Sequence, residues 1–193
     1  MIESTEDKRS SLLNTACRLY AGRGYDAVGI QELVDSVGVT KPTLYHYFGS
    51  KRGLLEIMVR EYGQDVSELV RAAADYQNDL SRCLERIAFA ILEAARTRPD
   101  FYRMLLSMYF APAGNEAHQV VRPLMEELYR VVEDVFRQAA SQHGNMIHRH
   151  QAYSVSFLGL VHTLVGLELS GSATLTDTEI RQMLHQFEHG IYS

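Results

Sequence analysis

The 70 residues that follow Pro123 contain no proline, and the whole chain of 193 residues contains only four. Apolar residues recur throughout at spacings of three and four, and no convincing run alternates apolar and polar residues. Such spacing places apolar side chains on one face of an α-helix, and proline is the residue that most strongly interrupts a helix. The sequence therefore predicts an all-α protein.

The apolar stripes, together with capping and breaking residues, predict about nine helices. Gly24 is placed to end the first helix, because glycine readily adopts the left-handed conformation of a C-terminal cap. Thr176 and Glu179 have the spacing of a capping box at the start of the last helix. The expected ranges are about 5–23, 30–37, 40–48, 50–75, 79–97, 100–110, 115–141 (kinked or restarted at Pro123), 148–170 and 177–191.

The charge of the chain is unevenly distributed. A net charge of -5 argues against a nucleic-acid partner for the chain as a whole. Residues 1–53, however, carry seven bases and six acids, a net charge of +1, so the other 140 residues carry -6. Between Gly38 and Gly53 there are three bases and no acid. The sequence indicates a small cationic module attached to an acidic body.

Residues 39–51, VTKPTLYHYFGSK, combine features that neither a core helix nor a solvated helix needs. They hold three aromatic residues, a proline and a histidine, with a lysine near each end. Gly38 lies where the chain must turn between two short helices, the geometry of a helix-turn-helix unit whose second helix can enter the major groove of DNA. The expected core of this unit is formed by Ile30, Leu33, Val34, Val37, Val39, Leu44 and either Tyr47 or Phe48.

The remaining side chains of this segment have chemistry suited to nucleic acid. Thr40 can cap the second short helix and meet a phosphate, and Pro42 presents an apolar ring suited to a thymine methyl group. Lys51 lies in the first turn of the next helix, where free amides attract an anion. The pattern alone also fits a tight helical corner whose aromatic residues are only core. The predicted DNA contacts are Thr40, Lys41, Pro42, Thr43, Tyr45, His46 and Lys51.

Residues 24–55, GYDAVGIQELVDSVGVTKPTLYHYFGSKRGLL, resemble the DNA-binding domain of the tetracycline-repressor (TetR) family of bacterial transcriptional regulators. The resemblance implies that these seven residues touch double-stranded DNA. It also implies a helix-turn-helix domain over residues 1–53, followed by a helical ligand-binding and dimerisation domain over residues 54–193. The chain departs from the family at Val28 and Gly29, where Ser or Thr is usual. Arg52 replaces a common acid and is expected to restore one phosphate contact.

Small residues form a continuous stripe along the helix expected at 148–170, beside a parallel stripe of bulky residues. A smooth stripe lets another helix approach closely. That helix could belong to the same chain or to a second copy, and the resemblance implies a homodimer in which the last two helices pair across a two-fold axis. Such a dimer matches a palindromic operator. The predicted interface comprises Ala152, Ser156, Gly159, Thr163, Gly166 and Ser170, with Ile180, Met183, Leu184 and Phe187 of the last helix.

Methionines and aromatic residues gather in residues 101–114, FYRMLLSMYFAPAG. Such side chains can line an adaptable pocket for a small apolar or amphipathic ligand, although each alone fits plain core equally well. The resemblance places an inducer pocket in this part of the chain. The predicted set that includes pocket-lining residues is Met104, Met108, Phe110, Tyr153, Phe157 and His162.

Several other kinds of function find no support in the sequence. His143, His148 and His150 lack the spacing and partners of a metal site, so no metal and no cofactor are expected. No motif for catalysis or phosphate binding is present, so the chain is not predicted to be an enzyme. Cys17 and Cys83 fit buried free thiols, and no secretory signal or membrane span is expected, which favours the cytoplasm.

These features predict a sequence-specific DNA-binding regulator of transcription. The principal hypothesis is a small-molecule-responsive repressor that binds a palindromic operator as a homodimer. Two alternatives are an activator, or a partner-controlled regulator, of the same fold. A third is a helical ligand-binding protein that has lost DNA binding, which Gly29 and the small charge of residues 1–53 would explain.

Overall fold

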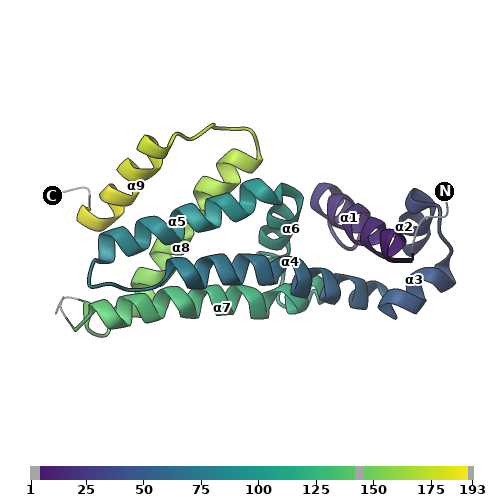
Figure 1. The fold of residues 1–193 in the computed structure, drawn as a ribbon, viewed down its shortest axis with the longest axis horizontal. Coiled ribbons are helices and arrows are strands. Elements are labelled where there is room, and N and C mark those ends of the chain that lie inside the picture. The colour runs from purple at the N-terminus through teal and green to yellow at the C-terminus, as the bar shows by residue number, and fades with distance from the viewer. Residues whose placement is uncertain (1–4, 142–145, 191–193) are drawn as a thin grey trace. The chain divides into compact units, whose positions relative to one another are not determined.

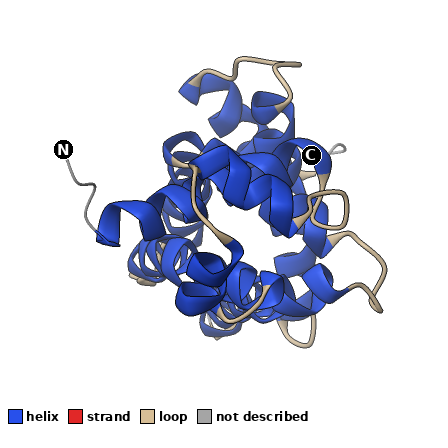
Figure 2. Cartoon of the chain, turned by 90° about the vertical axis from the view of Figure 1, so that its right-hand side faces the viewer, coloured by secondary structure: helices blue, strands red, loops and turns tan. Residues whose placement is uncertain are grey.

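The computed structural model describes residues 5–141 and 146–190, and within these ranges helices are joined by loops and turns, without a strand (Figures 1 and 2). The all-α prediction is confirmed, and the expected helix ends are correct to within two residues. The helices are α1 (Thr5–Arg23), α2 (Ile30–Val37), α3 (Lys41–Phe48), α4 (Lys51–Ala73), α5 (Leu80–Thr97), α6 (Pro99–Tyr109), α7 (Glu116–Ala139), α8 (His150–Leu169) and α9 (Asp177–His189).

The helix ends form where the sequence places capping residues. Gly24, after α1, has a φ of +81°, a left-handed conformation that side chains with a Cβ rarely adopt. At the start of α9 the Thr176 hydroxyl accepts a hydrogen bond from the amide of Glu179 at 3.3 Å, and the Glu179 carboxylate accepts one from the amide of Thr176 at 2.8 Å. The Ser50 hydroxyl caps α4 by accepting from the amide of Gly53 at 2.9 Å.

Helix α7 contains Pro123 in its interior and continues through it. The sequence left open a kink or a restart at this position, and the helix does not restart. Proline removes one backbone hydrogen bond, which a helix of 24 residues with a buried apolar face can absorb.

The chain packs as two compact units, and α4 and α7 each contribute residues to both. The first unit comprises residues 1–64 and 98–124, and the second comprises residues 65–97 and 125–193. One buried cysteine lies in each unit, Cys17 in the first and Cys83 in the second. These two units are defined by which residues pack together. The boundary expected after residue 53 separates a DNA-binding from a ligand-binding domain, and it stays a prediction.

The first unit is built around α1, which packs against α2, α3 and α6. Leu12, Leu13 and Ala16 of α1 are buried, as their spacing on one face predicts. Opposite them the second and third helices bury Leu33, Val34, Leu44 and Phe48, whereas the other expected core residues, Ile30, Val37, Val39 and Tyr47, are half-buried. This core fixes α3 so that one side of it faces outward.

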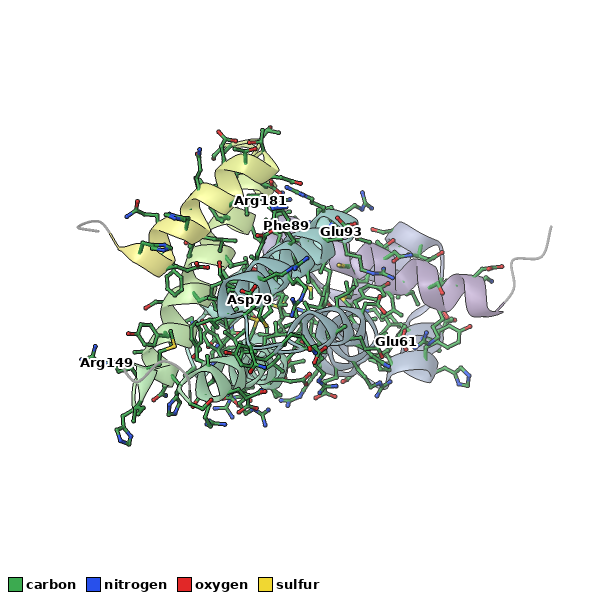
Figure 3. The ribbon with its side chains drawn as sticks, turned by 60° about the vertical axis from the view of Figure 1, so that its left-hand side comes forward. Glu61, Asp79, Phe89, Glu93, Arg149 and Arg181 are labelled. Carbon is green, nitrogen blue, oxygen red and sulfur yellow. The ribbon has the colours of Figure 1, made fainter. Side chains whose placement is uncertain are left out.

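The second unit is centred on α5, which packs against α8 and α9. Its buried residues include Ile87 and Ile91 of α5 and Val161 of α8. Contacts between side chains also join these helices outside the core. Arg96 donates to Glu168 at 2.6 and 2.9 Å, and the Arg181 guanidinium lies 5.0 Å from the centre of the Phe89 ring (Figure 3).

Candidate nucleic-acid interface and ligand pocket

The turn between α2 and α3 is made by Gly38, which has a φ of +70°. Its amide donates to the carbonyl of Asp35 at 3.3 Å, and the amide of Val39 donates to the carbonyl of Val34 at 3.0 Å. These bonds satisfy carbonyls at the end of α2, and the left-handed conformation they require favours glycine. The turn expected at Gly38 is therefore present.

Helix α3 has a buried side and an exposed side. Leu44 and Phe48 are buried, whereas Tyr45 keeps 44% of its surface exposed. Lys41, Pro42 and His46 are exposed as well. Because both buried residues anchor the helix in the core, the polar and cationic groups on its other side are available to a partner. The structure thus brings together the side chains predicted to contact DNA from α3.

Thr40 caps α3, as predicted. Its hydroxyl lies 3.4 Å from the amide nitrogen of Thr43, which donates to it, and 2.9 Å from the hydroxyl of Thr43. Thr40 is exposed and Thr43 is half-buried. The two hydroxyls therefore form a linked pair at the N-terminal end of the helix, where free amides already favour an anion.

Lys51, the seventh predicted DNA contact, is engaged inside the protein. Its ammonium group donates to the carbonyl of Tyr25 at 2.6 Å and lies 4.1 Å from the centre of the Tyr25 ring. Burial lowers the pKa of Lys51, because desolvation disfavours the charged amine. A contact between Lys51 and a phosphate would need this amine to be shared with the carbonyl, so that role stays a prediction.

The positions that depart from the family pattern have distinct environments. Val28 is buried in the core and cannot meet a phosphate. Gly29 caps α2 with φ -87° and ψ 155° but offers no side-chain hydrogen bond. Arg52 donates to Glu56 at 2.7 Å and lies 3.9 Å from Glu116. The phosphate contact expected of Arg52 therefore competes with two carboxylates of the protein.

Gly53 is a structural residue that the sequence interpretation missed. A Cβ at this position would lie 2.0 Å from the carbonyl oxygen of Phe48, the last residue of α3. Only glycine permits so close an approach of α3 to the first turn of α4. The available signal was the glycine itself, since glycine inside a helix is unfavourable unless another backbone comes close.

The loop between α1 and α2 is joined to the start of α7. The Tyr25 hydroxyl donates to the Glu116 carboxylate, and Asn115 donates to Asp26 at 2.8 Å. Asn115 also caps α7 by accepting from the amide of Ala117 at 2.8 Å. These residues are about 90 positions apart in the chain, and no local sequence pattern indicates such a pairing.

Helix α8 presents its small-residue stripe to the outside. Five of the six stripe residues are exposed and Gly166 is half-buried, while Val155, beside the stripe, keeps 52% of its surface exposed. Helix α8 is long and apolar enough to cross a membrane. The core helix of a soluble protein can meet the same criteria of length and composition. Within the described residues the chain itself does not cover this stripe, so the alternative of a neighbour from the same chain is not supported.

The stripe of α9 behaves differently from its prediction. Ile180 and Leu184 are 0% and 3% exposed because they pack inside their own unit, in which α9 lies on α5. Met183 and Phe187 are half-buried. Ile180 and Leu184 therefore have no surface left to offer a second subunit, which corrects their expected place in an interface. The last residue of this stripe, Ile191, lies outside the described residues.

A pocket of about 460 Å³ lies in the second unit. Of the six residues predicted for a ligand site, Tyr153 lines it. Phe157 is buried behind the wall, with its ring centre 6.5 Å from that of Phe136 and 5.8 Å from that of Phe187. The lining residues are Asn78, Asp79, Leu80, Ser81, Leu84, Phe136, Met146, Tyr153, Phe187, Glu188 and His189.

The other residues predicted for the ligand site lie elsewhere. Met104 and Met108 are buried in the core of the first unit, and Phe110 keeps 72% of its surface exposed. His162 is buried beside Tyr129, at 6.4 Å between ring centres, and burial lowers its pKa to about 4. These four residues are not among those that line the pocket of about 460 Å³, since apolar residue type does not distinguish pocket wall from core.

The histidines considered as metal ligands are not clustered. His150 lies 3.3 Å from the Glu133 carboxylate, and His148 adopts a φ of +64° in the turn before α8. Among the described residues, no group of three or more His, Cys, Asp or Glu side chains could hold a metal ion. His143 lies outside the described residues.

Comparison with known proteins shows a family match over the N-terminal part of the chain. A family model described as bacterial regulatory proteins of the tetR family matches residues 12–58, which run from α1 into α4 and contain the whole helix-turn-helix. The helix-turn-helix segment is thus similar to that of the TetR family. The chain is 28% identical over 115 residues to the HTH-type transcriptional activator FasR of Mycolicibacterium smegmatis, a match that covers 60% of this chain and 52% of FasR.

The likeness to solved TetR-family structures extends over the whole chain. PfmR from Thermus thermophilus aligns over 100% of both chains with a TM-score of 0.74 and 18% identity. AibR, solved in complex with isovaleryl coenzyme A and operator DNA, aligns over 93% of this chain and 96% of its own with a TM-score of 0.71 and 22% identity. At these identities the likeness concerns the fold. The chain spans about half the length of the curated relatives it matches.

Proposed function

We propose that this chain is a sequence-specific DNA-binding regulator of transcription, acting as a homodimer in the bacterial cytoplasm rather than as an enzyme. The observation that carries the proposal is the sidedness of α3. Leu44 and Phe48 fix the helix in the core, while Lys41, Pro42, Tyr45 and His46 stand on its exposed side. A helix held in this way can enter the major groove.

Some groups at α3 are suited to phosphate contacts that position the helix on DNA, and others are suited to contacts with the bases. The Thr40 hydroxyl and the Lys41 ammonium group suit phosphate oxygens, which fix register but carry no sequence information. The Pro42 ring suits a thymine methyl group, and the His46 imidazole can hydrogen-bond a base edge or a phosphate. With so few cationic side chains on the surface, we expect a moderate negative slope of log affinity against log salt.

A homodimer follows from the needs of recognition and from the exposed stripe on α8. One short helix contacts only a few base pairs, so two copies related by two-fold symmetry are needed to read a palindromic operator. The stripe of Ser156, Gly159 and Thr163 is smooth enough for a second helix to approach closely, and Val155 and Leu167 beside it are partly exposed apolar residues that such contact would bury.

Control by a small molecule is supported by the pocket in the second unit. Its volume of about 460 Å³ lies in the range of small-molecule sites. A ligand that binds more tightly to the conformer unable to span two successive major grooves would release the operator. We propose repression relieved by ligand as the mode of control. FasR is an activator by name, so the sign of regulation is tested separately by transcription from a template that carries the selected operator.

The test is selection of bound duplexes from a random DNA library by the purified protein at moderate salt. We expect a palindrome to be enriched, and Lys41→Ala to weaken binding to it about ten-fold. Arg149→Ala is the matched control, because Arg149 is an exposed cation before α8 and should leave affinity unchanged.

A failed selection would be repeated after the protein is unfolded, dialysed and refolded, which removes a bound inducer. Enrichment only after refolding would support both DNA binding and ligand control. No enrichment in either sample, with the protein folded, would overturn the proposal and favour a ligand-binding protein that has lost DNA binding.

A further inference from the structure

The pocket in the second unit is bounded by four helix ends. Leu80 and Leu84 come from the start of α5, Phe136 from the end of α7, Tyr153 from the start of α8 and Phe187 from the end of α9. These side chains give the pocket an apolar wall. Its polar lining residues are Asn78, Asp79, Ser81, Glu188 and His189.

The aromatic side chains of the wall contact one another and the core. The rings of Phe136 and Tyr153 stack with centres 5.6 Å apart and planes inclined by 29°. Phe157, which is fully buried, contacts Phe136 and Phe187 from behind, at 6.5 and 5.8 Å between ring centres. Phe157 thereby supports two of the lining rings, and Phe136 in turn supports Tyr153. Aromatic faces carry negative charge density and attract a cation.

The charges that line the pocket are mainly negative. Asp79 and Glu188 contribute carboxylates, His189 contributes an imidazole and Tyr153 a phenol, and no Lys or Arg is present among the described lining residues. The Nδ1 atom of His189 lies 3.0 Å from the carbonyl oxygen of His185, and the two imidazoles stack at 4.0 Å. His189 is thus engaged within α9.

The N-terminal end of α5 could in principle attract an anion into this pocket. That end is already capped by Asp79, whose carboxylate accepts a hydrogen bond from the amide of Arg82 at 2.9 Å. A carboxylate in this place interacts favourably with the helix dipole. An anionic ligand would therefore meet a negative group where it would otherwise find free amides.

We propose that this pocket binds a small organic cation with an apolar body, such as an arylalkyl ammonium ion. The apolar body would lie against the leucines and rings, and the ammonium group would sit between the aromatic faces and the carboxylates of Asp79 and Glu188. This inference rests on the proposed function as a ligand-responsive regulator and names the charge of its ligand. A fatty acid as long as such an ammonium ion would bind more weakly, because its carboxylate would be repelled by those of Asp79 and Glu188.

Three probes that share one apolar body test the sign of the charge: 4-phenylbutylamine, 4-phenylbutanol and 4-phenylbutyric acid. Titration calorimetry with the full-length protein at pH 7.5 measures each dissociation constant. We expect the amine to bind at least ten-fold more tightly than the alcohol, and the acid more weakly than either. Equal binding of the three probes, tighter binding of the acid, or no binding of any probe at millimolar concentration would overturn the inference.

Variants locate the site. Glu188→Gln and Asp79→Asn should each weaken the amine three- to ten-fold and leave the alcohol unchanged, and asparagine preserves the cap of α5. Tyr153→Leu keeps an apolar wall without an aromatic face and should weaken the amine alone. Glu93→Gln is the matched control, because Glu93 is an exposed acid about four turns along α5 from Asp79 (Figure 3). An unchanged amine affinity in Glu188→Gln and Asp79→Asn would place the cation elsewhere.

Binding of the amine and binding of DNA are measured separately, so the two proposals can fail independently. Amine binding without loss of affinity for the selected operator would support the site and contradict its role as the control site. Operator binding together with a preference for the acid would support the regulator and overturn the inference about charge.

Discussion

The Tyr25 hydroxyl donates a hydrogen bond to the Glu116 carboxylate, and this bond joins the loop before α2 to the first turn of α7. Burial raises the pKa of Tyr25, and the hydrogen bond to Glu116 raises it further. The carbonyl and ring of the same tyrosine hold Lys51 of α4. Tyr25 thus connects the segment that precedes the helix-turn-helix with two longer helices of the first unit.

Removal of the Tyr25 hydroxyl should destabilise the first unit. Tyr25→Phe deletes the bond but keeps the ring, and because Glu116 is partly exposed the cost should be about 1 kcal/mol. Urea unfolding followed by circular dichroism measures the change. Tyr45→Phe is the control, since Tyr45 is exposed and should unfold as the wild type does. Equal stability of the two variants would show that the bond contributes nothing.

Substitution of Gly53 should disturb the junction of α3 and α4. The Cβ of Gly53→Ala would lie 2.0 Å from the carbonyl oxygen of Phe48, so the backbone must shift. Overpacking of this kind costs about 1–3 kcal/mol, and displacement of α3 should also reduce operator affinity. Gly22→Ala is the control, because a Cβ in α1 at that position meets nothing within 4 Å. A Gly53→Ala protein with wild-type stability and affinity would refute this account.

A serine at position 29 should improve DNA binding. Gly29 already has the extended backbone of an N-cap, and an added Cβ meets nothing within 4 Å. Serine can accept a hydrogen bond from an amide of α2, which adds a few tenths of a kcal/mol, and its hydroxyl can reach a phosphate. We expect operator affinity to rise about two- to five-fold in a fluorescence anisotropy titration. Gly29→Ala, which lacks the hydroxyl, should gain nothing; a gain equal to that of serine would argue against the hydroxyl.

The buried imidazole of His162 should make stability depend on pH. Its folded pKa of about 4 lies below the ordinary value of 6.5, so the unfolded chain binds the proton more readily. The contribution of neutral His162 to the free energy of unfolding is therefore fully present above pH 6.5. It falls as the pH decreases toward and below 4, by about 3 kcal/mol in total. Denaturant unfolding at several pH values measures the fall. His162→Leu should lose this component between pH 6.5 and 4, and a profile identical to that of the wild type would assign the dependence to other groups.

The stripe on α8 should control association. Gly159→Glu places a charge at the centre of the stripe, where an added Cβ meets nothing within the chain, so the fold should be preserved. We expect the dimer dissociation constant to rise at least 100-fold in sedimentation velocity experiments, because a buried unpaired charge is costly. Glu93→Gln again serves as a surface control. A Gly159→Glu protein that stays dimeric would place the interface on another surface.

The sequence specified the local elements better than their partners. The helices, the turn at Gly38, the caps at Thr40 and Thr176 and the two sides of α3 all follow from residues within a few positions of each other. Tyr25 and Glu116, whose hydroxyl and carboxylate form a hydrogen bond, are 91 positions apart in the sequence. A local sequence pattern carries no information about such a pair.

The apolar stripes illustrate the same limit. Spacing predicts that Ile180 and Leu184 share a face of α9, but it cannot tell whether α5 of the same chain or a second subunit covers that face. In the same way Met104 and Tyr153 are both apolar residues on helices, yet one is core and the other lines a pocket. The difference arises from how helix ends meet, which depends on contacts between distant segments.

The rate at which each buried cysteine is alkylated should report how often its unit opens. Burial raises the pKa of the Cys17 thiol to about 12 and also raises that of Cys83, so at pH 8 only about one Cys17 side chain in ten thousand is a reactive thiolate. Alkylation of the folded protein should therefore be slow at both thiols and report transient exposure of each. Mass spectrometry after timed pulses of iodoacetamide can then rank the two units by how often each opens, without any introduced label.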